Sequence, residues 1–447
     1  MMRLPTTPAS MPTAHPQTHA AATAGPALSQ RYAAVRAQTL ALAAPLGEAD
    51  AQAQSMPDAS PAKWHLAHVT WFFETFVLER FEPGFRPHHA AYRELFNSYY
   101  VGVGSAHPRP QRGLLTRPTL AEVRDYRAAV DERMHSLLSA CDDGALAALV
   151  ELGLQHEQQH QELLLTDLLH LFSFNPLAPV YRPQWPLGAV APAALAWVAQ
   201  PGGLVEIGHD GSGFAFDNEG PRHRQFLHPY ALANRLATNG DWLAFMADGG
   251  YRDPRWWLAA GWDWVRAQQV RAPLYWQPSA GEGWQAFTLH GLAAVDPHTP
   301  VTHVSLYEAD AYARWSAAQQ RLPLRLPTEV EWEAAAAPLA AGAIASGNFV
   351  ETQALHPVPV ARREEGLLQL FGDVWEWTAS SYLPYPGFRA WDGAVGEYNG
   401  KFMIDQTVLR GGSCATPRSH IRASYRNFFP AAARWQFNGL RLACDAD

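Results

Sequence analysis

The sequence predicts an α+β protein of two domains, an N-terminal four-helix bundle followed by a domain that mixes strands with helices. Between residues 26 and 174, four long segments repeat apolar residues with the period of a helix. After Asn175, prolines cluster up to Pro192, and short β-like runs, glycine pairs and many tryptophans replace the helical pattern. A chain of 447 residues is also long enough for two or three buried cores.

The four helical segments have lengths typical of a bundle. Ser60 with Pro61 is expected to cap the second helix, and Thr119 before Leu120-Ala-Glu122 to cap the third. The predicted helices are Ala27 to Leu46, Pro61 to Phe81, Leu120 to Cys141 and Gly144 to Phe174.

Other segments complete the predicted organisation. Residues 1–25 are expected to form a disordered leader, residues 26–180 the bundle and residues 195–447 the second domain. The bundle contains a link, Glu82 to Pro118, that is too long for a plain turn and is therefore expected to be functional or disordered. In the second domain, helices are expected over Asn239 to Ala247, Leu306 to Ala318 and Thr328 to Ala337, between long loops that suit a pocket.

Composition limits the partners. The net charge is -8 without a Lys/Arg cluster, which argues against nucleic acid or an anionic membrane and favours small molecules. The sequence contains no run of about 18 apolar residues, so no membrane-spanning segment is predicted. Three cysteines without CxxC spacing predict neither a disulfide framework nor a thiolate zinc site, and they fit a reducing cytoplasm.

Two histidines in the fourth helix are the first candidates for chemistry. His156 and His160 are four residues apart, so they share one helix face with a stripe of leucines that should face the core. A metal would satisfy both buried imidazoles, although hydrogen-bonded core histidines remain an alternative. A catalytic site needs a third ligand. The second helix offers His65 and His68, and its periodicity does not choose between them.

At this point the residues resemble a known family. His156-Glu-Gln-Gln-His160-Gln-Glu with Trp64-His-Leu-Ala-His68 resembles the DinB-like bundle of the ergothioneine-biosynthesis sulfoxide synthases, the EgtB family. The second half resembles the formylglycine-generating-enzyme (sulfatase-modifying-factor) fold, which is related to C-type lectins. That likeness rests on Arg325-Leu-Pro-Thr-Glu329-Val-Glu-Trp332-Glu, Val374-Trp-Glu-Trp377-Thr and Leu409-Arg-Gly-Gly-Ser413.

The resemblance implies a non-heme iron(II) enzyme that uses dioxygen to join a thiol to C2 of the imidazole of hercynine. Iron(II) would be held by His68, His156 and His160, leaving His65 as a structural histidine. Gln159 would contact hercynine. A pocket of Asn427, Phe428 and Phe429 would receive its trimethylammonium group by cation-π contact.

The resemblance is closer to the branch of the family that takes free cysteine. Where the actinobacterial branch has its catalytic tyrosine this sequence has Gln406, and Phe429 and Ala433 replace the anchors for γ-glutamylcysteine. In the cysteine branch the tyrosines come from the bundle link, which matches Tyr99 and Tyr100 as proton donors. Arg109 or Arg112 would then grip the carboxylate of cysteine.

Four alternatives stay open at this stage. A selenoneine synthase, which joins a selenosugar to hercynine, has similar motifs. A zinc thiol transferase would use the same three histidines. A formylglycine-generating enzyme would need Cys414 as a reactive thiol, although a buried small hydrophobe is the expected role of that residue. A lectin-like binding module would use the second domain without any metal.

Overall fold

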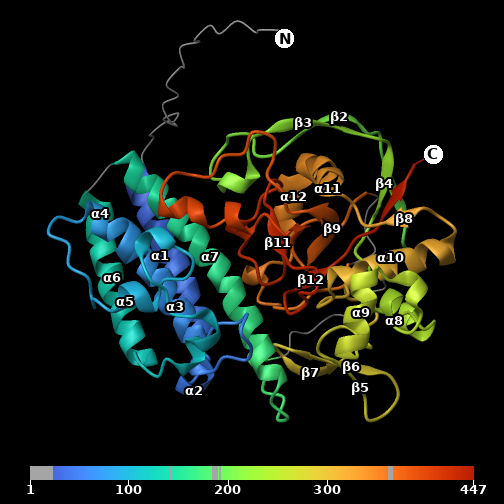
Figure 1. Cartoon of the computed structure of the whole chain (residues 1–447), viewed down its shortest axis with the longest axis horizontal. Helices are drawn as coiled ribbons and strands as arrows, with labels where there is room; N and C mark the ends of the chain where they lie inside the picture. Colours follow the sequence, from blue (N-terminus) through green and yellow to red (C-terminus); the bar gives the residue numbers. More distant parts are fainter. Residues whose placement is uncertain (1–23, 141–142, 184–189, 191–192, 361–365, 447) are drawn as a thin grey trace, which may run out of the picture.

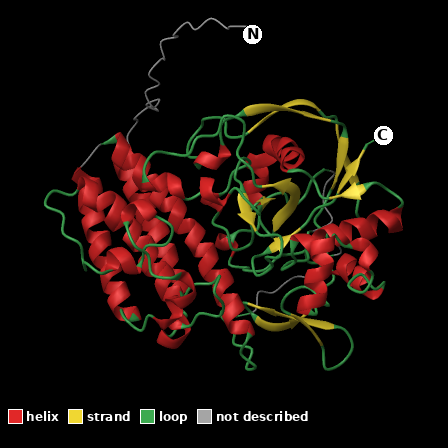
Figure 2. Cartoon of the chain, viewed as in Figure 1, coloured by secondary structure: helices red, strands yellow, loops and turns green. Residues whose placement is uncertain are grey.

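The computed structural model describes residues 24–140, 143–183, 190, 193–360 and 366–446. The helical bundle lies on one side and the mixed domain on the other, with the long helix α7 between them (Figure 1). Among the described residues, the bundle consists of helices and loops, and the strands all belong to the second domain (Figure 2). The predicted α+β class and the four long helices are confirmed.

Three of the four bundle helices begin and end within a few residues of the predicted bounds, and the second is α-helical only as far as Phe72. The four are α1 (Ala24–Ala43), α3 (Ala62–Phe72), α6 (Leu120–Ala140) and α7 (Gly144–Ser173). The short α2 (Glu48–Gln52) joins α1 to α3. Of the expected leader, residues 1–23 lie outside the described residues, whereas Ala24 and Gly25 already belong to α1 and correct its predicted end.

The second predicted helix is continuous but not uniform. After α3 it passes through a π-helical stretch, Phe73–Leu78, and ends in α4 (Glu79–Phe81). This stretch packs closely on α7 at Gly153, where a Cβ atom would lie 2.6 Å from the ring of Phe73. Glycine at this position therefore lets α3 and α7 approach each other, which is the approach that the histidines require.

The predicted caps are half right. Thr119 and Glu122 form the expected reciprocal cap at the start of α6, with the Glu122 amide donating to Thr119 Oγ1 at 3.2 Å. At α3, Pro61 occupies the N-cap position and Ser60 caps nothing. Instead, the Ser60 amide donates to Asp167 and its hydroxyl accepts from Arg112, so its polar groups serve tertiary contacts and not the helix end.

A buried ionic cluster ties three of these helices together. Glu157 of α7 is fully buried and accepts from Arg36 and Thr39 of α1, at 2.9 and 2.6 Å, and from Arg127 of α6. Although burial opposes ionisation, the two guanidinium groups lower the pKa of Glu157 to about 2. The cluster fixes the rotation of α7 and thereby the direction of its histidines.

The link between α4 and α6 is ordered and folds back over the bundle. It contains α5 (Tyr92–Leu95) and two 3-10 turns, η2 (Val101–Val103) and η3 (Arg109–Leu114). The carboxylate of Glu397 in the second domain accepts from the amides of Val101 and Gly102 at 2.8 Å each. The second domain therefore helps to hold the segment that carries Tyr99 and Tyr100.

The second domain is built on small sheets with helices packed around them. One antiparallel sheet has the order β1-β4-β13-β8, and a second has the order β11-β10-β9-β12, in which β12 runs parallel to β9. A hairpin, β2-β3, and a three-stranded sheet, β5-β6-β7, complete it. The strands are β1 (Trp197–Gln200), β2 (Gly203–Ile207), β3 (His223–Leu227), β4 (Tyr230–Ala233), β5 (Trp276–Pro278), β6 (Trp284–Thr288), β7 (Gly291–Ala294), β8 (Leu324–Arg325), β9 (Trp375–Ser381), β10 (Thr407–Arg410), β11 (Asn427–Phe429), β12 (Asn438–Gly439) and β13 (Ala443–Asp445).

Its helices include the three that the sequence predicted. These are α8 (Asn239–Ala247), α10 (Leu306–Gln320) and α11 (Glu329–Ala336), and the structure adds α9 (Ala259–Gln268) and α12 (Ala340–Ser346). Within the described part of the chain, no helix is long and apolar enough to cross a membrane.

The face of α7 that carries Gln158 and Glu162 docks on the second domain. Glu162 is buried and accepts from Trp375 Nε1 at 2.8 Å and from the hydroxyls of Ser413 and Thr416 at 2.5 and 2.7 Å. Gln158 Nε2 donates to Ser419 Oγ at 2.5 Å. Because α7 also carries His156 and His160, this docking places the histidines at the boundary between the domains.

Candidate metal centre and substrate cleft

Three histidines from two helices converge in the bundle. His68 of α3 and His156 and His160 of α7 each offer a ring nitrogen, and these nitrogens lie within 4.8 Å of one another. Burial lowers the pKa of His68 and His160 well below its usual range and that of His156 to about 4. All three imidazoles are therefore neutral near pH 7, the state in which imidazole binds a metal.

The remaining ring nitrogens fit a metal site. His68 Nδ1 lies 2.6 Å from the carbonyl oxygen of Phe96 and donates to it, which leaves its Nε2 with a lone pair. The buried Nδ1 of His156 has no hydrogen-bond partner among the described residues. A neutral, buried set of nitrogens with an unpaired member is a donor set that suits a divalent transition metal.

His65 does not belong to the set of three possible metal ligands, but it contacts one of them, His160. Its Nδ1 is 2.8 Å from Nδ1 of His160, and its Nε2 is 3.0 Å from the carboxylate of Asp167. A carboxylate paired with a histidine that orients a second histidine resembles the outer layer of many metal sites.

A small cavity of about 50 Å³ opens beside the three histidines. Arg112 borders it with its guanidinium 3.4 Å from the centre of the Trp64 ring, and Trp64 in turn stacks on His68. Arg112 is only 4% exposed, donates to Ser60 Oγ at 2.9 Å and has no carboxylate within ion-pair distance among the described residues. Burial lowers the pKa of Arg112 to about 9, so the guanidinium still carries its charge near pH 7.

The two tyrosines of the link lie at this cavity in different surroundings. Tyr100 is buried against Trp71 and Phe76, and burial raises the pKa of its phenol. The Tyr99 hydroxyl accepts from Arg109 Nη1 at 3.1 Å. The small cavity is lined by both tyrosines, whereas the larger cleft next to it is lined by Tyr99 alone of the two.

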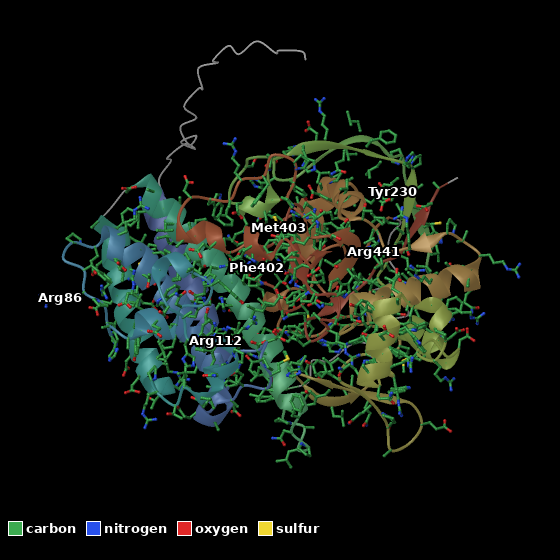
Figure 3. The ribbon with its side chains drawn as sticks, in the orientation of Figure 1. Arg86, Arg112, Tyr230, Phe402, Met403 and Arg441 are labelled. Carbon is green, nitrogen blue, oxygen red and sulfur yellow. The ribbon has the colours of Figure 1, made fainter. Side chains whose placement is uncertain are left out.

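The larger cleft, about 430 Å³, runs between α7 and the second domain. Gln159 lines it from α7, and Asn427, Phe428 and Phe429 line it from β11. Phe428 stacks on Tyr382 with ring centres 4.1 Å apart. Figure 3 shows Arg112, which borders the small cavity, in the bundle and Phe402, which borders the cleft, in the second domain. The side chains shared by the cleft and the small cavity are Tyr99, Arg109, Leu163 and Tyr398.

The structure thus brings every predicted site residue to one of two adjoining cavities, and it adds residues that were missed. Tyr398 borders both cavities but lies in a stretch without a recognisable motif. Trp375 lines the cleft and belongs to the Val374-Trp-Glu-Trp377-Thr motif, and Tyr425 lines it two residues before the predicted Asn427, so both positions were available signals. His420, also at the cleft, gave no signal.

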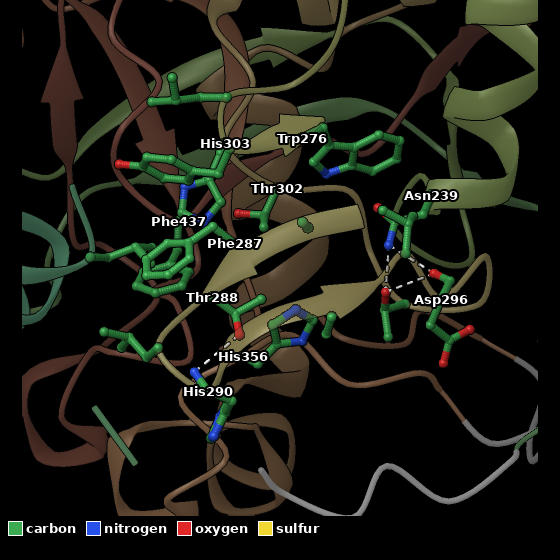
Figure 4. Close-up of a pocket in the computed structure, with 18 of the residues that line it drawn as sticks. Asn239, Trp276, Phe287, Thr288, His290, Asp296, Thr302, His303, His356 and Phe437 are labelled. Carbon is green, nitrogen blue, oxygen red and sulfur yellow. Dashed lines mark hydrogen bonds between the residues drawn. The ribbon is translucent and has the colours of Figure 1, made fainter. Parts of the chain in front are cut away.

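A separate cavity of about 210 Å³ lies between the end of α7 and the second domain and contains none of the predicted site residues. His290, His303 and His356 border it (Figure 4). His290 places its Nδ1 and Nε2 at 2.9 and 2.6 Å from the carbonyl oxygens of Pro183 and Ala354. Within the described chain, these three histidines do not form a set that could hold a metal ion.

Comparison with known proteins places this architecture. Residues 31–164 match the DinB superfamily, and residues 191–446 match the sulfatase-modifying factor enzyme 1-like domain. A hercynine oxygenase from Mycolicibacterium thermoresistibile is 32% identical over 90% of this chain and 91% of its own. The chain belongs to the hercynine oxygenase family. A second hercynine oxygenase, from Mycolicibacterium smegmatis, is 31% identical over 94% of this chain and 98% of its own.

The second half alone also has relatives outside the hercynine oxygenases. A formylglycine-generating enzyme from Thermomonospora curvata is 31% identical over 42% of this chain and 71% of its own. However, Cys414 is fully buried, and burial raises the pKa of its thiol well above the usual range. A protonated, inaccessible thiol is unsuited to nucleophilic chemistry.

Against that family background, the positions of three cleft residues bear on the thiol substrate. Gln406, Phe429 and Ala433, the residues expected to mark a departure from the actinobacterial branch, all border the cleft. Among the described residues that line the cleft, Arg109 is the one guanidinium. A carboxylate bound in the cleft would therefore meet a guanidinium where the cleft adjoins the three-histidine cavity.

Proposed function

We propose that this chain is an oxygen-dependent, non-heme iron(II) sulfoxide synthase that joins the sulfur of cysteine to C2 of the hercynine imidazole. Hercynine and cysteine supply all the electrons that dioxygen accepts, because removal of the thiol and C2 hydrogens yields one sulfoxide and one water. The observation that carries the proposal is that Tyr99 and Arg109 border both the three-histidine cavity and the aromatic cleft.

The metal would be held by His68, His156 and His160. Three neutral imidazoles without a carboxylate would suit an iron(II) ion, which would supply the one-electron chemistry that dioxygen requires. Zinc would fit the same nitrogens, but a thiol transfer gives no role to the Tyr99 phenol at the junction.

Hercynine suits the cleft because the cleft is aromatic. Trp375, Phe402, Phe428 and Trp435 line it, and aromatic faces attract a trimethylammonium group by roughly 0.5 to 2 kcal/mol per good contact. Gln159 reaches the cleft from the same helix as His156 and His160. It would hold the imidazole edge while the aromatic groups hold the cation.

Cysteine suits the junction because of its arginines. Arg109 and the buried, unpaired Arg112 both border the three-histidine cavity, and a guanidinium can grip a carboxylate with two hydrogen bonds. A longer γ-glutamyl donor would extend along Phe429 and Ala433, which offer it no charge. Tyr99 would deliver the proton that directs oxidation to the C–S bond, because its hydroxyl is held by Arg109 at the junction.

The test is to supply iron(II)-loaded protein with hercynine, dioxygen and equal amounts of cysteine, γ-glutamylcysteine and a selenosugar, and to identify the products by mass spectrometry. The expected result is the cysteine-derived sulfoxide as the main product. If only the selenosugar reacts, the protein is a selenoneine synthase and the sulfur assignment is wrong.

A further inference from the structure

A row of hydrogen bonds leaves α7, enters the second domain and returns to α7 one turn later. Gln155 Oε1 lies 2.7 Å from Nδ1 of His420, and His420 Nε2 lies 3.0 Å from the hydroxyl of Tyr425. That hydroxyl accepts from Nε2 of Gln159 at 2.9 Å. Gln155 and His420 are almost fully buried, whereas Gln159 borders the cleft.

The direction of this row is set at its outer end. Gln155 Nε2 donates to Glu151 Oε1 at 2.8 Å, and Glu151 is paired with Arg31 at 2.7 Å. A carboxylate only accepts hydrogen bonds, so the amide group of Gln155 must present its NH₂ to Glu151 and its oxygen to His420. Turning this amide over would place two oxygens in contact.

The tautomer of His420 follows from that orientation. Because Gln155 presents an oxygen, Nδ1 of His420 must carry a hydrogen and donate. His420 is 1% exposed, and burial with the nearby Arg422 lowers its pKa well below the usual range, which keeps the ring neutral. Its Nε2 therefore carries a lone pair and accepts from Tyr425.

The last step fixes Gln159. The Tyr425 hydroxyl has one hydrogen, which it donates to His420, so it can only accept from Gln159. Gln159 must then turn its NH₂ toward Tyr425 and its Oε1 away. No described donor contacts that oxygen, and Gln159 lines the cleft.

We propose that His420 and Tyr425 are positioning residues that lock the Gln159 amide with its oxygen in the cleft, so that the enzyme selects a substrate ring that donates an N–H there. This inference rests on the proposed function, since it assigns the imidazole of hercynine as that ring. The row of hydrogen bonds orients the Gln159 amide and does not transfer protons, because amide groups carry no titratable proton. Without the row, Gln159 could present either end of its amide.

The first test measures affinity without turnover. Iron(II)-loaded protein is titrated calorimetrically with hercynine under nitrogen and without thiol. Tyr425→Phe and His420→Leu should each raise the Kd for hercynine roughly tenfold, the loss expected for one well-placed hydrogen bond. Gln158→Leu is the matched control, because it removes the neighbouring contact between α7 and Ser419 and leaves the row intact.

The second test separates orientation from general loosening of the cleft. Each of two isomeric oxazole analogues of hercynine has an oxygen in place of one of the two ring nitrogens, so neither has a ring N–H to donate. In the unmodified protein, the Kd of the more weakly bound oxazole should be at least roughly tenfold higher than the Kd of hercynine. In Tyr425→Phe, the ratio of these two Kd values should fall to about threefold. A purely structural role would weaken all ligands equally, and an unchanged ratio overturns the proposal.

A third measurement does not depend on the proposed function. Long-range ¹H–¹⁵N spectra of protein with ¹⁵N-labelled histidine rings, assigned by the signal lost in His420→Gln, report the tautomer of His420. The proposal requires Nδ1–H, and either Nε2–H or a charged ring at pH 7 overturns it. If the parent fails to bind hercynine, the proposed function fails, and this spectrum still decides whether the row has the stated direction.

Discussion

Nδ1 of His65 lies 2.8 Å from Nδ1 of His160, and the opposite nitrogen of His65 lies 3.0 Å from Asp167. Because the carboxylate accepts from His65 Nε2, His65 Nδ1 must itself accept from His160. His160 then carries its hydrogen on Nδ1 and keeps the lone pair on Nε2. A histidine that the sequence left as a rival ligand thus sets the tautomer of its neighbour.

Changing His65 should weaken metal binding without removing it. His65→Asn should lower the iron(II) affinity by roughly 10- to 100-fold, because the partner that orients His160 is lost. The measurement is anaerobic competition with a chelator of known affinity. The control is His170→Asn, since His170 lies on the same helix but contacts Ser55. If His65→Asn lost iron completely while His68→Ala retained it, His65 would be the metal ligand and His68 would not.

The two link tyrosines should differ in effect. Tyr99→Phe removes the hydroxyl at the junction of the cavities, so it should abolish sulfoxide formation and divert cysteine to its sulfinate. Tyr100→Phe should have a milder effect, because Tyr100 is buried against Trp71 and Phe76 away from the cleft. Product ratios from mass spectrometry report both variants. Sulfoxide that persists in Tyr99→Phe and disappears in Tyr100→Phe assigns the proton to Tyr100.

The aromatic wall should bind the trimethylammonium group. Phe428→Ala should weaken hercynine binding by roughly 0.5 to 2 kcal/mol while the affinity for iron(II) stays the same, because cation-π attraction is lost on one side. Phe429→Ala tests the neighbouring ring. Calorimetry with hercynine and with histidine, which lacks the methyl groups, gives the check. Equal losses for both ligands, or none, argue that the two rings only pack the domain.

Acidification should destabilise the metal-free protein. Burial lowers the pKa of His356 to about 4 and that of His303 to about 3, whereas unfolded histidines titrate near 6.5. Between these values the unfolded chain binds more protons, so stability is full above pH 6.5 and falls toward pH 4. Each group contributes up to about 1.4 kcal/mol per pH unit. The thermal midpoint should drop less steeply in His356→Gln, and a midpoint that rises on acidification contradicts this.

Much of the fold was predictable because its signals are local. The 3.6-residue period defined the four bundle helices, and the Thr119–Glu122 cap depends on residues three apart. The π-helical stretch Phe73–Leu78 was not predictable, since α3 is apolar on all sides and gives no phase. Residues 1–25 were expected to be a leader, but α1 already begins at Ala24.

The site was predictable only in part. The i, i+4 spacing of His156 and His160 is a local signal, but the choice of His68 over His65 came from resemblance. Physically, that choice depends on Asp167, which lies 102 positions from His65 along the chain and holds its Nε2. Tyr398, Tyr425 and His420 reach the cleft through contacts between domains, which no periodicity reports.

The most direct test of the central claim follows the atoms that change. Iron(II)-loaded protein is given cysteine, ¹⁸O₂ and hercynine deuterated at imidazole C2, and the products are resolved by mass spectrometry. The account predicts a conjugate of cysteine and hercynine that has lost the deuterium and gained one ¹⁸O atom. Recovery of fully deuterated hercynine beside cysteine sulfinate carrying two ¹⁸O atoms would contradict it.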